Sequence, residues 1–293
     1  MPSLPVLKTL ARELVSRERS PRRTEPDLVM DDPEKVAAYT RAGREDGVMA
    51  PVYLFHCAQV CEVIRPGDTV VDLGCGPATQ LAMVARLNPD VRFVGVDLSE
   101  EMLERARAYG AEQGLGNVAF QQADVTDLGF LGDASVDAVF STVALHHLPD
   151  VDHLQRTFAE VARVLRPGGG LYLVDFGHLK SEKSIEYFAY QYSDRQPELF
   201  TLDYLYSLRA AFPLADFQRL TDRHLAGRAR VYSTFLMPFM VVVKSPPRAG
   251  EVPQGVRAGL AALRAALPSY HRTDLQDLRT FFRLGGLASP LLG

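Results

Sequence analysis

The chain has 293 residues, 47% of them hydrophobic and 23% charged, a composition typical of a soluble globular protein with a substantial core. No uninterrupted apolar run approaches the ~18 residues that a membrane helix needs. The net charge of −4 argues against phosphate binding, which requires a concentrated basic face. We therefore expect neither a membrane nor a nucleic acid among the partners.

The first part of the chain, residues 1–66, is expected to form a helical cap. Basic residues alternate with leucines and valines near the start, which favours an amphipathic helix over a targeting segment because no apolar core with a cleavage site follows. The run Asp31-Asp32-Pro33-Glu34 is a helix start signal, since Asp caps a helix and Pro opens one. We expect the protein in the cytoplasm.

Three cysteines do not make a disulfide framework. Cys57 and Cys61 lie four apart in an apolar segment and so share one face of a predicted helix. Buried thiols are the preferred interpretation, and a two-thiol metal site is the alternative. We expect no metal.

Residues 67–180 alternate short apolar runs with helical patterns, which predicts a parallel sheet with helices on both faces. The domain built on this sheet is expected to span 67–245. Ligands of such doubly wound, Rossmann-like sheets bind at the carboxyl ends of the strands. The predicted strands are Thr69–Leu73, Arg92–Asp97, Val118–Ala123, Val136–Ser141 and Leu171–Phe176, and the predicted helices are Ala78–Leu87, Ser99–Gly114 and His153–Leu165.

The first of these strands ends in Asp72-Leu73-Gly74-Cys75-Gly76 directly before a helix. Glycines at such a turn adopt dihedral angles closed to other residues and let the backbone approach a ligand. The second strand ends in Asp97, 25 residues after Asp72. A carboxylate at that place can accept hydrogen bonds from both hydroxyls of a ribose.

The third and fourth strands add further polar residues at the same edge. The third ends at Asp124, followed by the apolar Val125, a pair suited to a flat ring with an exocyclic amine. The fourth ends at Ser141 and continues into His146 and His147. Acids at successive strand ends are hard to explain by core packing alone.

The sequence therefore resembles the class I S-adenosylmethionine (SAM)-dependent methyltransferases, particularly the small-molecule type of ubiquinone and menaquinone biosynthesis. The resemblance covers 68–176 and two further strands expected within 225–244, and it rests on VVDLGCGPAT, VGVDLSEEML, ADVTDLGF, VDAVFSTVALHHL and LRPGGGLYLVDF in order. It implies a seven-stranded, mostly parallel sheet, SAM as cofactor with S-adenosylhomocysteine as product, and a small-molecule acceptor. One departure from the family pattern is Ala78 at the third glycine of its loop.

The resemblance also implies a cofactor site. Asp72, Gly74 and Gly76 would shape the loop around the methionine part, and Asp97 would hold the ribose. Leu98 and Met102 would line the adenine pocket, Asp124 and Val125 would lie at the adenine amine, and Tyr39 would close over the methionyl end. For Arg44 the two interpretations are an ion pair with the cofactor's carboxylate and a solvated helix face. The residues expected to bind the cofactor are Tyr39, Arg44, Asp72, Gly74, Cys75, Gly76, Thr79, Asp97, Leu98, Met102, Asp124, Val125, Ser141 and His146.

Several other functions stay open. A nicotinamide-binding loop has a third glycine where this chain has Thr79, so an NAD-dependent oxidoreductase is the weaker alternative. A SAM-binding regulator, an inactive scaffold and a SAM-using enzyme such as an aminopropyl transferase are the others. The sequence does not choose between oxygen, nitrogen, sulfur and carbon as the methylated atom.

Methyl transfer is an in-line displacement, so much of its catalysis can come from holding donor and acceptor in line. A general base helps when the acceptor must lose a proton. The candidate catalytic residues are His146, His147, His178 and Tyr39. For each histidine the alternative is a ring that packs or orients its loop.

The rest of the chain is expected to cover the site. Residues 181–212 are rich in aromatic side chains and are interpreted as a helical insert or lid, with helical core packing as the alternative. Residues 246–293 are expected to form a helical tail. A homodimer stays open.

Overall fold

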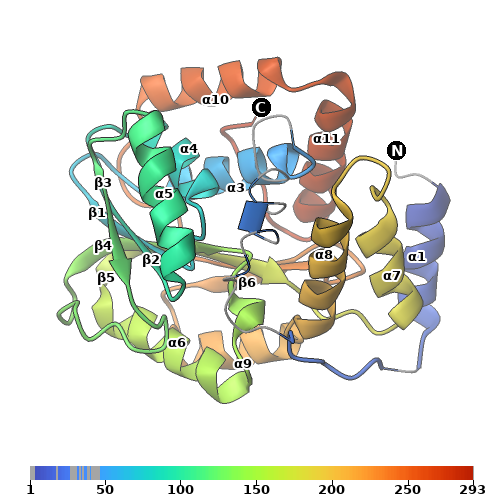
Figure 1. Ribbon diagram of the computed structural model, residues 1–293. Helices are drawn as coiled ribbons and strands as arrows, with labels where there is room; N and C mark the ends of the chain where they lie inside the picture. Colours follow the sequence, from blue (N-terminus) through green and yellow to red (C-terminus); the bar gives the residue numbers. More distant parts are fainter. Residues whose placement is uncertain are drawn as a thin grey trace.

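The computed structural model describes residues 4–17, 19–26, 32, 34, 36–37, 40 and 47–292. A seven-stranded sheet in the order β3-β2-β1-β4-β5-β7-β6 runs through the centre of the molecule (Figure 1). The pairs from β3 to β5 are parallel, and β7 runs antiparallel to both of its neighbours. The strands are β1 (Thr69–Leu73), β2 (Arg92–Asp97), β3 (Val118–Gln122), β4 (Val136–Thr142), β5 (Leu165–Phe176), β6 (Arg230–Ser233) and β7 (Met240–Lys244).

Helices cover both faces of this sheet, which confirms the predicted fold class (Figure 1). The described helices are α1 (Leu4–Val15), α3 (Ala50–Val63), α4 (Thr79–Leu87), α5 (Glu100–Glu112), the 3-10 helix η1 (Leu145–His147), α6 (Val151–Val164), α7 (Glu182–Tyr190), α8 (Glu198–Ala210), α9 (Leu214–His224), α10 (Gln254–Ala266) and α11 (Ser269–Leu284).

The continuous apolar runs of the strands follow from this double cover. Val70 packs into a core with side chains of α3, α4 and α5, whereas its neighbour Val71 packs into a second core with side chains of α6 and α9. Successive side chains of a strand point to opposite faces, so both faces must be apolar when helices cover both. The strand order also places a switch point at β1, which pairs with β2 on one side and β4 on the other.

The helices at the two ends of the chain pack on different parts of the molecule. α1 lies against α7, and the buried Glu13 accepts hydrogen bonds from the backbone N–H groups of Lys180 (2.8 Å) and Ser181 (3.0 Å), at the start of α7. α10 and α11 instead pack against α3 and α4 (Figure 1). In the part of the chain that the structure describes, no helix has the length and hydropathy needed to cross a membrane.

β5 begins earlier than predicted, at Leu165 rather than Leu171. The sequence analysis left 166–170 between a predicted helix and a predicted strand, but Gly170 pairs with Ala138 of β4. A Cβ atom on Gly170 would lie 1.9 Å from the carbonyl oxygen of Val63, at the end of α3. The glycine is therefore required because α3 approaches the sheet closely at this point. The local sequence pattern does not predict this contact.

Gly170→Ala should destabilise the protein by at least ~1–3 kcal/mol, because the added methyl group overlaps the Val63 carbonyl. Urea unfolding measures the change. Gly116→Ala is the matched control, since a Cβ there meets nothing within 4 Å. An unchanged unfolding midpoint in Gly170→Ala would contradict the packing described.

Candidate functional site

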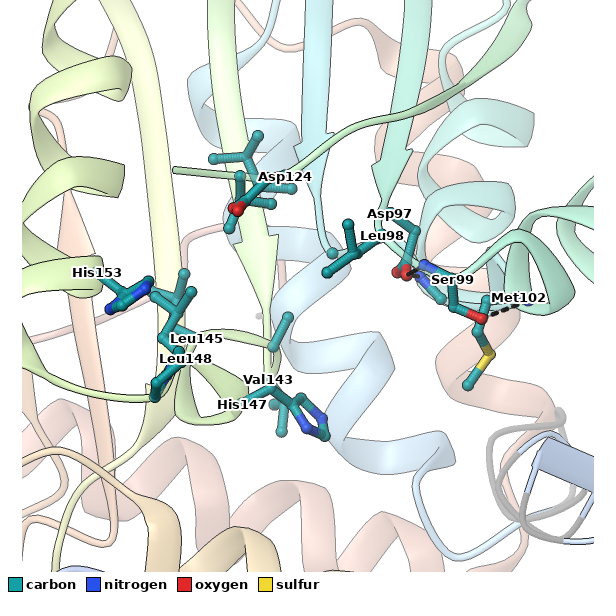
Figure 2. A pocket seen from close by; sticks show the side chains of 16 residues that line it. Asp97, Leu98, Ser99, Met102, Asp124, Val143, Leu145, His147, Leu148 and His153 are labelled. Carbon is teal, nitrogen blue, oxygen red and sulfur yellow. Dashed lines mark hydrogen bonds between the residues drawn. The ribbon is translucent and has the colours of Figure 1, made fainter. Parts of the chain in front are cut away.

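A cavity of about 240 Å³ opens at the carboxyl ends of β1, β2 and β4, at the switch point of the sheet (Figure 2). Residues from several loops and from the start of α5 surround it. The lining includes Gly74, Gly76, Asp97, Leu98, Ser99, Met102, Asp124, Val125, Val143, Leu145, His147, Leu148 and His153. Half of the residues predicted to bind the cofactor therefore lie together around this cavity.

The loop after β1 is shaped by backbone conformations that glycine favours. Gly74 and Gly76 have φ angles of 69° and 51°. A Cβ on Gly74 would lie 2.4 Å from the Cβ of Ala144, so the close contact of this loop with the β4 loop also demands a glycine. Ala78, the departure from the family pattern, has a φ of 61° and so holds the same left-handed conformation at a steric cost.

Asp97 ties this loop to the start of α5. Its Oδ2 accepts a hydrogen bond from the Gly76 N–H (2.8 Å) and its Oδ1 accepts one from the Ser99 N–H (3.0 Å). Burial raises the pKa of Asp97, and these hydrogen bonds act in the opposite direction. Each carboxylate oxygen has a second lone pair, so a ribose diol can still donate to both.

A second, smaller cavity adjoins the first beneath the glycine loop, lined by Tyr53, Asp72, Cys75, Thr79, Gln80 and Thr142 among others. Burial and the charge of Asp97 raise the pKa of Asp72 well above its ordinary value. Three side-chain atoms here are buried without a hydrogen-bond partner: Oγ1 of Thr79, Oε1 of Gln80 and Oγ1 of Thr142. Unsatisfied buried polar atoms are costly, which indicates that a polar ligand group belongs in this cavity.

The far end of the larger cavity suits a flat ring. Leu98 is 49% exposed although it is apolar, and Met102 lies on the adjacent first turn of α5, where Ser99 caps the helix through its Oγ (Figure 2). Asp124 uses Oδ1 to accept the N–H of Thr126 (2.8 Å). An apolar slot beside a carboxylate can hold an adenine and accept from its amine. The residues therefore fit SAM along the whole site.

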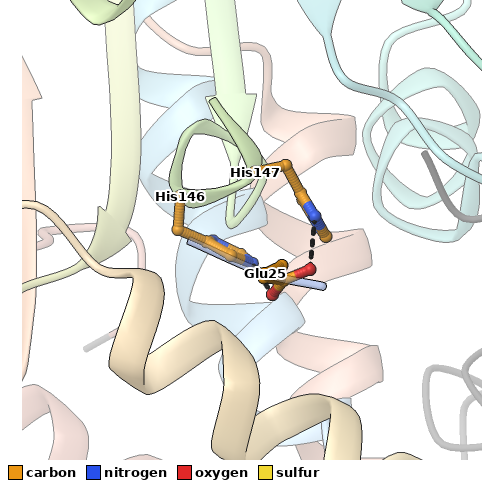
Figure 3. Close-up of side chains that lie close together, drawn as sticks. All are labelled: Glu25, His146 and His147. Atoms are coloured by element: carbon orange, nitrogen blue, oxygen red, sulfur yellow. Dashed lines mark ion pairs between the residues drawn. The ribbon is translucent and has the colours of Figure 1, made fainter. Parts of the chain in front are cut away.

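Two histidines in the segment that follows β4 contact acidic side chains beside the cavity. His146 is buried, and its Nδ1 lies 2.7 Å from Oδ1 of Asp175, the last acid of β5. His147 lines the cavity, and its Nδ1 lies 2.8 Å from Oε2 of Glu25 (Figure 3). Glu25 raises the pKa of His147 to about 9 against the opposing effect of burial.

Glu25 and Asp175 were missed by the sequence analysis. Asp175 had a usable signal, because it is a further acid at the end of a predicted strand. Glu25 had none, because it lies in a basic stretch far from every motif, and only the tertiary fold brings it to the histidines.

The remaining predicted site residues lie as follows. Ser141 is buried and donates from Oγ to the carbonyl oxygen of Leu73 (2.7 Å), so it bridges β4 and β1 and is outside both cavity linings. Nε2 of His178 lies 2.6 Å from the carbonyl oxygen of Ser20, also away from the two cavities. Tyr39 and Arg44 lie outside the described residues. The functional roles predicted for these four stay predictions.

Known proteins resemble this chain in sequence over part of its length. Residues 70–169 match the family model described as a methyltransferase domain. The chain is 42% identical over 125 residues to 27-O-demethylrifamycin SV methyltransferase of Amycolatopsis mediterranei, covering 42% of this chain and 44% of the relative. It is 43% identical over 103 residues to trans-aconitate 2-methyltransferase of an Azoarcus species, covering 35% and 37%. The chain thus spans less than half the length of these relatives.

Solved structures share the fold over a longer stretch. The plantazolicin methyltransferase BpumL, solved in complex with SAH, aligns over 91% of this chain and 92% of its own, with a TM-score of 0.55 and 17% identity. A SAM-dependent methyltransferase from Aquifex aeolicus aligns over 73% and 99%, with a TM-score of 0.50 and 19% identity.

The finer resemblance to the ubiquinone and menaquinone enzymes stays a prediction. The family match over 70–169, the strand order and the carboxylates gathered at the strand ends agree with one another. Together they place this part of the chain in the class I SAM-dependent methyltransferase family.

Proposed function

We propose that the protein methylates an oxygen atom of a small molecule, with SAM as the methyl donor. The observation that carries this proposal is His147, which lines the cofactor cavity beside the enclosed His146, with each histidine held by a carboxylate. A hydroxyl acceptor must lose its proton, and a histidine oriented by an acid is the residue best suited to take it. Methyltransferases for oxygen acceptors also stand among the relatives, including the O-methyltransferase cnsE of Penicillium expansum, 39% identical over 111 residues.

The residues of the cofactor cavity have separate tasks in this proposal. SAM, when bound, supplies an electrophilic methyl group on a sulfonium. Asp97 would hold the ribose, and Leu98 and Met102 would contact the adenine. Asp72 would supply negative charge to the amino end, where the unpartnered hydroxyl of Thr79 also lies. These residues would hold the donor in the cavity that His147 also lines.

The acceptor side lies between the histidines and the aromatic segment. α8 contacts η1, and Tyr204 of α8 is half-buried. Desolvation raises the pKa of Tyr204 well above its ordinary value, so its hydroxyl stays protonated at physiological pH. The Phe176 ring lies between those of His146 and Tyr204, at centroid distances of 5.4 Å from each. An apolar, aromatic wall excludes water and favours an acceptor with an extended apolar surface.

The wider setting follows from the same chemistry. We propose cytoplasmic action, where the cofactor is available, and a small-molecule partner. The division into a cap (1–66), a methyltransferase domain (67–245) with its insert (181–212), and a tail (246–293) also stays a proposal.

Incubation of the purified chain with methyl-labelled SAM and a panel of acceptors tests the function. The panel should contain aromatic and aliphatic hydroxyls, carboxylates, amines and thiols of matched size. Label transfer to a hydroxyl or carboxylate oxygen supports the proposal. Transfer only to nitrogen, sulfur or carbon would contradict it, as would SAM turnover that delivers a group other than methyl.

Asp97→Asn should weaken SAM binding by about ten- to a hundredfold, because hydrogen bonds to a charged group contribute ~1.5–3 kcal/mol. Isothermal titration calorimetry measures the affinity. Asp90→Asn, which changes an exposed acid next to the same strand, is the control and should bind SAM as the parent does. Equal affinity of the two variants would remove Asp97 from the site.

Asp72→Asn should stabilise the unliganded protein while weakening SAM binding about tenfold or more. The folded pKa of Asp72 lies above its unfolded value, so its contribution to stability is present at low pH and is lost as the pH rises through the folded pKa. At pH 7.5 the carboxyl group of Asp72 therefore lowers the free energy of unfolding, whereas the neutral amide of the variant does not. Thermal unfolding without ligand and calorimetry with SAM check the two effects. A lower melting temperature together with unchanged SAM affinity would refute both.

A further inference from the structure

A segment near the N-terminus crosses the mouth of the site and is firmly anchored there. We call residues 19–26 the N-terminal strap. The guanidinium group of Arg22 donates to the carbonyl oxygens of Ala210 (2.7 Å), Pro149 (2.7 Å) and Leu148 (2.6 Å). The same group lies 3.9 Å from the centroid of the Phe212 ring, a cation–π contact. The strap is therefore fixed to both η1 and α8 just before Glu25.

Glu25 turns inward from this anchor and is buried, with only 4% of its side chain exposed. Its Oε2 lies 2.8 Å from Nδ1 of His147 (Figure 3). Its Oε1 accepts a hydrogen bond from Oγ of Ser207 (2.8 Å). Burying a charge is costly unless it is paired and hydrogen-bonded, and here both conditions are met. The pKa of Glu25 is accordingly lowered to about 2, with the His147 hydrogen bond opposing the effect of burial.

The two neighbouring histidines are not equivalent. His146 is enclosed: its Nδ1 and its backbone N–H both contact the carboxylate of Asp175, and its ring is 2% exposed. Its Nε2 lies 3.6 Å from Glu25 Oε1, beyond hydrogen-bond distance. His147 instead lines the cofactor cavity. When Nδ1 of His147 donates its proton to Glu25, Nε2 carries the free lone pair, which is the tautomer that a general base requires.

We propose that Glu25 is a positioning residue that makes His147, rather than His146, the base for methyl transfer. This inference rests on the proposed function. The acceptor oxygen forms a bond to the methyl carbon while the carbon–sulfur bond breaks and leaves its electron pair on sulfur. The acceptor proton passes to Nε2 of His147, and the Glu25 carboxylate balances the new imidazolium charge. A residue remote in sequence thus completes the site.

The charges that face His147 come from four elements. They are Glu25 of the strap, Asp175 of β5, Asp203 of α8 and Asp97 of β2, and the ring of His146 packs beside it. A pKa near 9 means that His147 is protonated at neutral pH, and its basic form accumulates as the pH rises. kcat/KM should therefore increase with pH up to about 9. Removal of the Glu25 charge should shift this increase to lower pH.

A metal ion is the competing explanation for the same cluster. Ligand atoms of Glu25, His146 and His147 all lie within 4.8 Å of one another, and two imidazoles with a carboxylate suit a divalent transition metal. The Nδ1–Oε2 distance of 2.8 Å favours a hydrogen bond, because two ligands at ~2.0–2.1 Å from one tetrahedral ion are separated by roughly 3.3 Å. Metal analysis of the purified protein belongs in the test.

The test compares the full-length protein with Glu25→Gln, Glu25→Asp and Glu182→Gln. Glu182 is the matched control, because it accepts a hydrogen bond from Ser20 at the other end of the strap without touching His147. NMR titration of imidazole carbons in histidine-labelled protein reports the pKa of His147 without any acceptor. Glu25→Gln should lower this pKa by at least about one unit. Glu182→Gln should leave it unchanged, and Glu25→Asp should give an intermediate value.

Kinetics supply the second readout once an acceptor is known. Glu25→Gln should lower kcat by about ten- to a hundredfold with little change in KM for SAM, because Glu25 is outside the cofactor cavity lining. The acid limb of its pH profile should move to lower pH, and Glu25→Asp should recover part of the activity. If Glu25→Gln does not fold, Glu25→Asp carries both measurements, since lengthening the contact to His147 should still lower its pKa.

Three results would overturn the proposal: an unchanged His147 pKa in the Glu25 variants, an equal shift in Glu182→Gln, or one equivalent of bound metal that the Glu25 variants lose. Failure of the proposed function is a different observation. It would show as no SAM binding by calorimetry, or no methyl transfer by the parent protein, whatever the titration of His147.

Discussion

The site depends on one carboxylate that serves two backbone segments at once. Asp97 accepts from Gly76 of the loop after β1 and from Ser99 at the start of α5, so it fixes the loop against the helix before any ligand arrives. A carboxylate that is already held in place loses little conformational freedom when a diol binds. The entropic cost of binding is therefore smaller and the affinity is higher. The buried Asp72 nearby behaves differently. Its negative charge destabilises the unliganded fold but would attract a cationic ligand.

Much of the fold and of the cofactor cavity could be predicted because the signals are local. A strand covered on both faces is apolar throughout, and acids such as Asp97 and Asp124 stand out where such strands end. The early start of β5 could not be predicted, since Gly170 is needed for contact with Val63 of a different element. The place of Glu25 in the site could not be predicted for the same reason, because its partners His147 and Ser207 are distant in sequence.

The acceptor side that we propose is built from segments that lie outside the family match. The strap and α8 fall outside 70–169, yet both contact the segment after β4 that carries the histidines. Function on such folds is decided by these added segments, which explains why the cofactor follows from the sequence more readily than the acceptor does.

A crystal structure of the full chain with S-adenosylhomocysteine tests the central claim most directly. We predict both ribose hydroxyls within hydrogen-bond distance of the Asp97 carboxylate, the adenine between Leu98 and Met102, and the sulfur facing His147. A nucleoside bound elsewhere, or a ribose with no contact to Asp97, would contradict the account.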